Sequence, residues 1–152
     1  MMPSRRIDPL LKRAQEKEDT AVRTLADRQR ALETHLSRLD ELRRYAEDYA
    51  GAQMASTHPA QLLNRRAFLD RLDSAVAQQH RTVEDNRATV EAERARLLLA
   101  SRDKQVLEQL AASYRAQERQ LADKRSQRDL DDLGARRARL LQADDGDAGT
   151  SR

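Results

Sequence analysis

Several kinds of residue are absent or scarce in this chain of 152 residues, and each absence excludes something. The chain has no cysteine, which rules out disulfides and thiolate chemistry and is consistent with a reducing compartment. It has no tryptophan and a single phenylalanine, and aromatic residues make up 3% of the total, too few for the core of a compact globular domain.

Long hydrophobic runs are also missing. The longest purely apolar run is Leu97 to Ala100, far shorter than a helix needs to cross a bilayer. Residues 1–17 carry charges and no apolar stretch, so we do not expect a secretory signal. The sequence predicts a soluble, cytoplasmic protein.

What the chain does contain is charge and periodicity. Charged residues make up 36% of the chain, with Ala, Leu, Arg, Glu, Gln and Asp as the main residue types, a composition typical of long helices. A disordered chain is also highly charged, but here apolar residues recur with alternating spacings of four and three, which favours a helical seam. In the first half the seam positions are Ile7, Leu11, Ala14, Glu18, Ala21, Leu25, Arg28, Leu32, His35, Leu39, Leu42, Ala46 and Tyr49. In the second half they are Leu69, Leu72, Val76, Gln79, Val83, Asn86, Val90, Glu93, Leu97, Ala100, Lys104, Leu107, Ala111, Tyr114, Glu118 and Leu121.

Local signals predict where these helices begin and end. Asp8 can cap a first helix over about 7–51, with Pro9 at its first position and Gly51 at its C-terminus. Residues 51–59 read as a turn, with Thr57 or His58 as a cap for a second helix over about 59–142. Gly134 weakens this helix by roughly 1 kcal/mol relative to alanine, and residues 143–152 read as a disordered tail.

A short link between two long amphipathic helices makes them antiparallel neighbours. The sequence therefore predicts an all-α fold with one domain over 1–142, a long antiparallel two-helix coiled-coil hairpin. With the turn centred near residue 55, Ile7 should lie opposite roughly residue 104. The second helix then overhangs the first by roughly 35 residues, about 50 Å, and its apolar residues there invite a partner.

The sequence offers little for catalysis. His35, His58 and His80 have no metal-ligand spacing, and none of the glycines precedes a lysine in a phosphate-binding pattern. A pair of helices also lacks a pocket that excludes water. We therefore expect no catalytic residues, no metal and no cofactor, and a protein that is not an enzyme.

Aromatic residues gather around the predicted turn. A stripe on each helix brings apolar and aromatic residues to this end, and a second apolar stripe runs alongside each, so the apolar face is broader than a two-helix seam needs. We name this set the aromatic patch: Leu42, Tyr45, Tyr49, Phe68, Leu72, Ala75 and Gln79. Two interpretations remain open, a staple that holds the turn together and an exposed docking surface for a partner. Leu42, Leu72 and Gln79 also occupy seam positions, so they can be core or surface.

Positive charge concentrates in two segments that the hairpin brings to its open end. Residues 1–17 and residues 115–142 each carry a net charge of +3, whereas residues 18–114 carry −1. Such residues are usually a solvated helix face, and an acidic protein surface, a membrane or a nucleic acid is the alternative. Because acidic residues alternate with the arginines, we expect no nucleic-acid binding.

Three stretches resemble the FliJ family of the bacterial flagellar type III export apparatus. They are residues 39–49 (LDELRRYAEDY), residues 61–79 (QLLNRRAFLDRLDSAVAQQ) and residues 130–137 (LDDLGARR), of which the second is the most specific. The resemblance extends over nearly the whole chain in length and layout. It implies a stalk-like hairpin, similar to the central shaft of rotary ATPases, that binds and promotes the hexameric export ATPase FliI.

The same resemblance implies further partners and sites. The family engages the export gate protein FlhA and escorts export chaperones, which implies a cytoplasmic protein peripherally associated with the inner membrane through the gate, without membrane insertion. The family's partner-binding surface matches the aromatic patch. By the same analogy the ATPase end is a basic set: Arg5, Arg6, Lys12, Arg13, Arg119, Arg125 and Arg128. The alternatives are the equivalent stalk protein of a virulence injectisome and a generic structural coiled coil that self-associates into long dimers.

Overall fold

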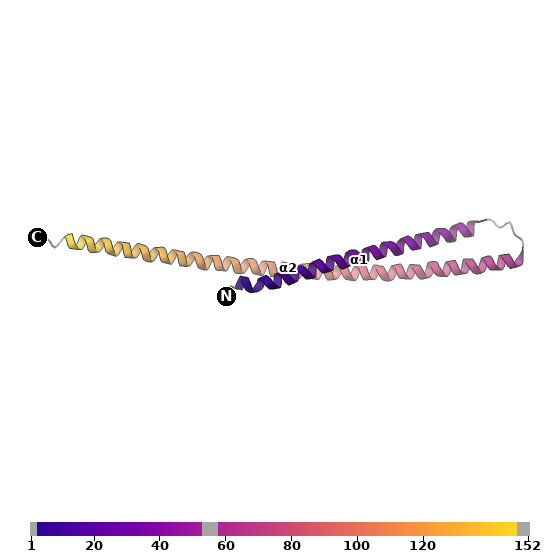
Figure 1. The fold of residues 1–152 in the computed structure, drawn as a ribbon, viewed down its shortest axis with the longest axis horizontal. Helices are drawn as coiled ribbons and strands as arrows, with labels where there is room; N and C mark the ends of the chain where they lie inside the picture. Colours follow the sequence, from indigo (N-terminus) through magenta and orange to yellow (C-terminus); the bar gives the residue numbers. More distant parts are fainter. Residues whose placement is uncertain (1–2, 53–57, 149–152) are drawn as a thin grey trace. The chain divides into compact units, whose positions relative to one another are not determined.

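Two helices account for nearly all of the chain. The structure, a computed structural model, describes residues 3–52 and 58–148. Helix α1 spans Pro3–Gly51 and helix α2 spans Pro59–Ala148 (Figure 1). Over these described residues there is no strand, which confirms the all-α prediction.

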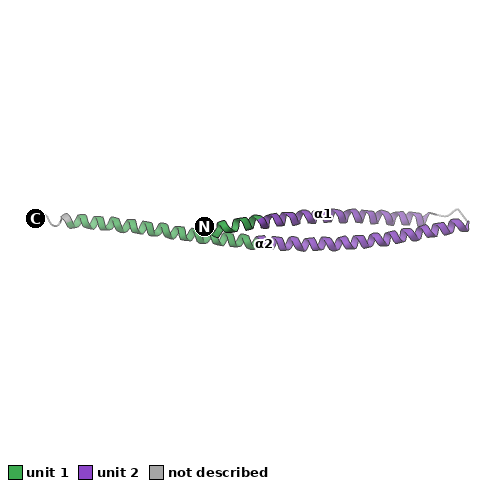
Figure 2. Cartoon of the chain, turned by 60° about the horizontal axis from the view of Figure 1, so that its bottom comes forward, with its two compact units in different colours: residues 1–12, 105–152 green, residues 13–104 purple. Residues whose placement is uncertain are grey.

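The contacts between the helices divide the chain into two units. Unit 1 contains Met1–Lys12 and Gln105–Arg152, and unit 2 contains Arg13–Lys104 (Figure 2). In unit 2, Glu18 lies next to Lys104 and the end of α1 next to Arg65, so the helices run antiparallel. In unit 1 the same direction follows because Ser4 is bonded to Glu118 and Asp8 to Arg115. The predicted antiparallel helical hairpin is confirmed.

The predicted seam positions form the interface between the helices. On α1 all of them are buried or half-buried except Arg28, and on α2 all except Leu121. The buried apolar residues are Ile7, Ala14, Leu39, Leu72, Val83, Val90 and Ala111, and each occupies a predicted seam position. Since spacings of four and three keep one face of a helix toward its partner, the periodicity alone identified these contacts.

Polar residues at seam positions pair with one another across unit 2. The Gln79 amide donates to the His35 carbonyl at 3.0 Å and lies 3.2 Å from the Nδ1 atom of the same residue. The Lys104 ammonium donates to the Glu18 carboxylate at 3.2 Å. A polar pair inside an apolar seam lowers stability but penalises other alignments, so these pairs help to specify the register.

The start of α1 differs from the prediction. The helix begins at Pro3, four residues before Ile7, and Pro9 lies inside it rather than at its first position. Asp8 does not cap the helix, because its carboxylate accepts a hydrogen bond from Arg115 at 3.1 Å. Contacts with α2 hold the residues before Pro9 in the helix: Ile7 is buried, and Ser4 is bonded to Glu118. Tertiary packing has overridden the local signal at Pro9.

The end of α2 also differs from the prediction. The helix continues through Gly134, where a Cβ atom would meet nothing within 4 Å, and ends at Ala148. The expectation of disorder is therefore wrong for residues 143–148, whereas residues 149–152 lie outside the described part. Strong helix formers follow Gly134, among them three arginines and two leucines, and they extend an existing helix at little cost.

The pairing register is shifted from the expected one. Asp8 pairs with Arg115, so its neighbour Ile7 lies close to the level of Arg115 on α2 and not opposite residue 104 as predicted. Part of the shift arises because the link is not symmetric: Arg65, in the second turn of α2, reaches the last carbonyls of α1. Of the predicted turn over 51–59, residues 53–57 lie outside the described part, Gly51 belongs to α1 and Pro59 to α2. The His58 carbonyl accepts a hydrogen bond from Leu62 N–H at 3.1 Å, which places His58 at the predicted cap position before α2.

Candidate partner-binding surfaces

Three aromatic rings pack together where α1 ends and α2 begins in unit 2. The ring centroids of Tyr49 and Phe68 are 4.6 Å apart, and Tyr45 meets Phe68 edge-on at 6.3 Å. Both tyrosines come from α1, one turn apart, and the phenylalanine comes from α2. Edge-to-face pairs of this kind add stability beyond the apolar area that they bury.

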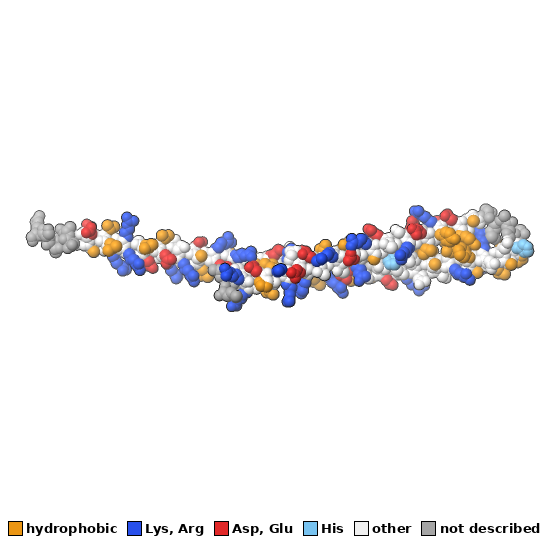
Figure 3. All heavy atoms as spheres, viewed as in Figure 1, with side chains coloured by type: hydrophobic (Ala, Val, Ile, Leu, Met, Phe, Trp, Pro, Cys, Tyr) orange, Lys and Arg blue, Asp and Glu red, His pale blue; other side chains and the backbone are white. Residues whose placement is uncertain are grey.

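The aromatic patch is only partly accessible to solvent. Tyr45 remains 54% exposed, Leu72 is buried at 8%, and the other five members are half-buried. In Figure 3 hydrophobic side chains gather on this face of unit 2 near the end of α1. The rings therefore staple the helix pair and also present an exposed edge, while Leu72 belongs to the core beneath. That the patch binds a partner stays a prediction.

A shallow hollow lies beside the patch. It has a volume of about 440 Å³ and is lined by Arg38, Glu41, Leu42, Tyr45 and Gln79. Its lining combines apolar side chains with one basic and one acidic residue, Arg38 and Glu41.

Arg65 connects the patch to the end of α1, and sequence reasoning missed it. Its Nη2 atom donates to the carbonyls of Tyr49, Ala50 and Ala52 at 3.2, 3.0 and 2.8 Å. Its guanidinium also lies 5.9 Å from the centroid of the Tyr49 ring, within cation–π range. The last carbonyls of a helix lack partners and carry partial negative charge. Arg65 therefore caps α1 from the opposite helix and holds Tyr49 in place.

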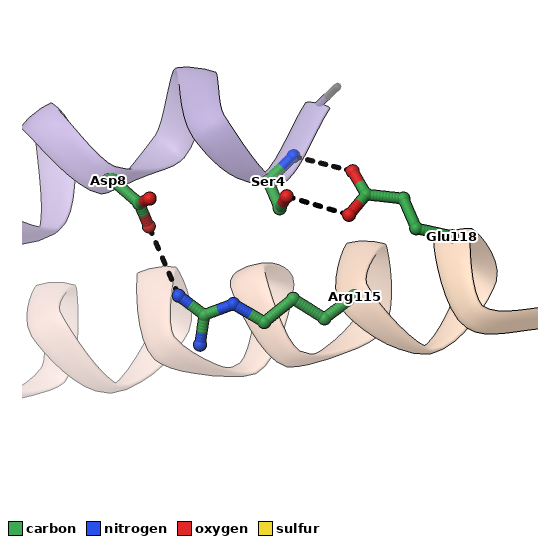
Figure 4. A network of polar contacts seen from close by, with 4 residues as sticks. All are labelled: Ser4, Asp8, Arg115 and Glu118. Atoms are coloured by element: carbon green, nitrogen blue, oxygen red, sulfur yellow. Dashed lines mark hydrogen bonds and ion pairs between the residues drawn. The ribbon is translucent and has the colours of Figure 1, made fainter.

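A second cross-helix cap lies at the start of α1, in unit 1 (Figure 4). The Glu118 carboxylate accepts the Ser4 backbone N–H at 3.1 Å and the Ser4 hydroxyl at 2.7 Å. One turn along, Arg115 donates to Asp8 at 3.1 Å. The Ser4 hydroxyl and N–H lower the pKa of Glu118, and Arg115 and Arg5 lower it further. A carboxylate thus satisfies a free N–H at the positive end of the helix.

The members of the basic set are all exposed, but they do not all belong to one unit. Arg13 lies in unit 2 and the other six lie in unit 1. Beyond Glu118, every residue from Arg119 to Gly146 is exposed. We name residues 119–146 the exposed segment. It is helical without any contact that buries it, and it includes Arg119, Arg125 and Arg128 of the basic set.

Metal-binding groups and membrane-spanning helices are both missing from the described residues. Among residues 3–52 and 58–148, no group of three or more His, Cys, Asp and Glu side chains could hold a metal ion. In the same ranges no helix is both long and apolar enough to span a membrane.

Comparison with known proteins identifies the family. The chain matches the flagellar FliJ protein family over residues 3–142, nearly its whole length. The chain belongs to this family. No curated protein and no solved structure matches it. The match to the FliJ family confirms the resemblance drawn from the sequence and makes the chain a structural component of flagellar protein export.

Four residues outside the predicted sites have defined roles in the structure of this FliJ family member. Arg65 and Ser4 cap α1 together with Glu118, and His35 holds Gln79 of the patch. The sequence carried a weak signal for Glu118 and His35, because both are polar residues at seam positions. It carried none for Arg65 or Ser4, since each acts on residues far away along the chain.

Proposed function

We propose that this protein is a non-enzymatic stalk and adaptor of the flagellar export apparatus. It binds the hexameric export ATPase FliI and promotes its assembly, engages the export gate protein FlhA, and escorts export chaperones. The observation that carries the proposal is the family match over residues 3–142. Binding to the gate keeps the protein at the inner membrane without inserting it.

The aromatic patch is the proposed contact for the gate and the chaperones. Tyr45 supplies an exposed ring beside the hollow, and packing against Phe68 and Tyr49 fixes its position. A preorganised aromatic anchor loses little conformational entropy on binding. Leu72 and Gln79 act indirectly, since Leu72 is buried and the Gln79 amide is bonded to His35.

Unit 1 is the proposed contact for the ATPase. The exposed segment has neither a partner helix nor a buried side chain, so it can be enclosed by another protein without unfolding anything. Arg119, Arg125 and Arg128 lie on it and can pair with acidic groups of the ATPase.

The test is the effect of the purified chain on the rate and oligomeric state of FliI from the same organism. We expect stimulation by the full chain and loss of stimulation when residues 123–152 are removed, a deletion that keeps Ser4–Glu118 and Asp8–Arg115. Arg125→Gln with Arg128→Gln should weaken stimulation severalfold. The matched control neutralises Arg71 and Arg81, two exposed arginines of unit 2.

Gate binding is tested separately. Tyr45→Ala should weaken binding to the cytoplasmic part of FlhA about tenfold or more, as expected for loss of an aromatic anchor. Leu98→Ala is the control, because Leu98 is 53% exposed, close to the 54% of Tyr45, but lies outside the patch. If both variants bind FlhA with equal affinity, the patch is not the contact for the gate. If the full chain has no effect on FliI, the proposed stalk role is wrong.

A further inference from the structure

The last turn of α1 relies on a contact from outside the helix. The Asp48 carbonyl accepts the Ala52 N–H at 3.0 Å, but the carbonyls that follow it lack a donor within α1, as at any helix end. Arg65 supplies a donor, since its Nη2 atom lies 3.2 Å from the Tyr49 carbonyl and 3.0 Å from the Ala50 carbonyl. A helix end opens more readily than the middle of a helix. One side chain of α2 therefore helps to keep the turn that carries Tyr49 closed.

Two side chains of α2 contact the Tyr49 ring. The Arg65 guanidinium carbon lies 5.9 Å from its centroid, and the Phe68 ring centroid lies 4.6 Å from it. Arg65 and Phe68 are three residues apart, so they share one face of α2. Phe68 in turn meets Tyr45 edge-on, with the two ring planes at 79°. The contacts therefore run without interruption from Arg65 to Tyr45.

The backbone provides a second connection between Tyr49 and Tyr45. The two residues lie one turn apart in α1, where the N–H of residue 49 bonds to the carbonyl of residue 45. Opening of the last turn breaks this bond and removes Tyr49 from Phe68, so Phe68 and Tyr45 lose part of the packing that fixes them. A ring that is no longer fixed loses more conformational entropy when a partner binds it.

Arg65 itself does not belong to the surface that a partner meets at the hollow. Of the described residues, those that line the hollow are Arg38, Glu41, Leu42, Tyr45 and Gln79. Arg65 is half-buried, and its Nη2 atom is engaged with the end of α1, including the Ala52 carbonyl at 2.8 Å. An effect of Arg65 on binding at the hollow must therefore pass through the rings.

We propose that Arg65 is the positioning residue of the aromatic patch. It keeps the last turn of α1 closed, and the closed turn holds Tyr45 where a partner meets it. This role rests on the proposed contact between the patch and FlhA. A partner that binds the closed form must also protect the last turn of α1 from opening, because coupling between two sites acts in both directions.

The first test needs no partner. In NMR spectra of the full chain, the ring resonances of Tyr45 and Tyr49 carry the ring-current shift of the phenylalanine that both rings contact. Arg65→Gln should move these resonances toward the values of an unstructured tyrosine, whereas Arg66→Gln should leave them in place. Tyr114 is the internal reference, because it lies in unit 1.

Arg65→Lys separates charge from geometry. An ammonium group keeps the charge at the helix end, but it lacks the planar fork of the guanidinium and stacks less well on an aromatic ring. The ring resonances of this variant should therefore lie between those of the wild type and Arg65→Gln. If the Tyr45 resonances are the same in the wild type and Arg65→Gln, Arg65 does not position the patch and the proposal is wrong.

The second test measures binding to the cytoplasmic part of FlhA in a double-variant cycle. Arg65→Gln should raise the dissociation constant about threefold to tenfold, because a smaller fraction of the chain is in the form that binds. In the Tyr45→Ala background the same change should add less than about twofold, because the ring through which Arg65 acts is absent. Equal losses in both backgrounds would show that Arg65 acts by another route, which overturns its positioning role.

The outcomes distinguish this role from the function on which it rests. If Tyr45→Ala weakens binding and Arg65→Gln does not, the patch is the contact for the gate and Arg65 does not position it. If Tyr45→Ala leaves binding unchanged, the patch is not that contact, and a role of Arg65 in gate binding is wrong as well. Hydrogen exchange gives the reciprocal check: FlhA should slow the exchange of amides 49–52 in the wild type, and unchanged exchange would overturn the coupling. Circular dichroism checks that each variant keeps its helices.

Discussion

At the scale of single residues, two side chains of α2 complete hydrogen bonds that α1 cannot make for itself. Arg65 donates to the carbonyls at the end of α1, and Glu118 accepts the N–H of Ser4 at its start. A cation thus lies at the negative end of the helix and an anion at the positive end, as the helix dipole favours. Both caps require the paired helices, so they strengthen the hairpin rather than the isolated helix.

Arg65→Gln should loosen the last turn of α1. It removes a charged donor shared by three carbonyls and the contact over Tyr49, a loss of about 1–2 kcal/mol for the local opening of this turn. Hydrogen exchange of the amides before Gly51 should become faster by about tenfold. Arg66→Gln is the matched control. Arg66 is the next residue along the chain, and its exposed side chain forms none of these bonds. Equal exchange in both variants would show that Arg65 does not cap α1.

Acidification should release the first turn of α1. The pKa of Glu118 in the folded chain lies below its ordinary value of 4.5, so its stabilising effect is complete above that pH. The effect is lost as the pH falls through the lowered pKa, because the protonated carboxyl accepts the Ser4 bonds less well. Carbon NMR of the Glu118 carboxyl should give the lowered pKa directly.

The acid effect should depend on the Ser4 contact. In Ser4→Ala the hydroxyl bond is absent, so the pKa of Glu118 should move back toward its ordinary value. A pKa that is the same in wild type and Ser4→Ala would contradict the cap drawn in Figure 4.

At the scale of elements, α1 contains an internal proline that costs stability. Pro9 has no N–H to donate to the Arg5 carbonyl, and a proline inside a helix costs about 3 kcal/mol relative to alanine. Packing of Ile7 and the Ser4–Glu118 bonds offset that cost. The residues before Pro9 are therefore held to the helix by tertiary contacts more than by the helix itself.

Pro9→Ala should therefore stabilise the start of α1. We expect amides of residues 4–8 to exchange more slowly, with a local gain of about 1–3 kcal/mol. Pro59→Ala is the control: Pro59 is the first residue of α2, where no hydrogen bond is lost, so replacement should change little. If Pro9→Ala leaves the exchange of these amides unchanged, Pro9 does not destabilise the start of α1.

At the scale of the whole chain, the distribution of buried residues separates a paired part from an unpaired one. Contacts between α1 and α2 reach Glu118, and beyond it the exposed segment buries nothing. Stability therefore resides in the paired helices, and the exposed segment adds no buried surface to them. Replacing Leu72 is a change to the core, so a test of the patch needs Tyr45 instead.

Removing residues 123–152 should leave the unfolding of the paired part nearly unchanged. Every deleted residue up to Gly146 is exposed, so the free energy of unfolding per molecule should change by about 0.5 kcal/mol or less. Denaturant titration followed at the tyrosines, whose rings lie at the paired helices, measures it. A loss of several kcal/mol would show that the exposed segment supports the helix pair.

The sequence by itself determined the elements and the seam. Spacings of four and three predict which face of each helix is buried, because helix geometry repeats locally, and only Arg28 and Leu121 departed from that pattern. The aromatic patch was also visible, since its residues recur at helical spacing on each side of the predicted turn.

Only the tertiary structure decided the register, the caps and the state of individual patch residues. Arg65 and Glu118 act on residues far from them along the chain, and no local pattern records such a pairing. The same holds for Pro9, whose signal for a helix start was overridden by packing. Whether Leu72 is core and Tyr45 is surface depends on how far each helix rotates toward the other. That rotation is set by the sum of all contacts along the pair, which a periodic pattern cannot resolve to a single side chain.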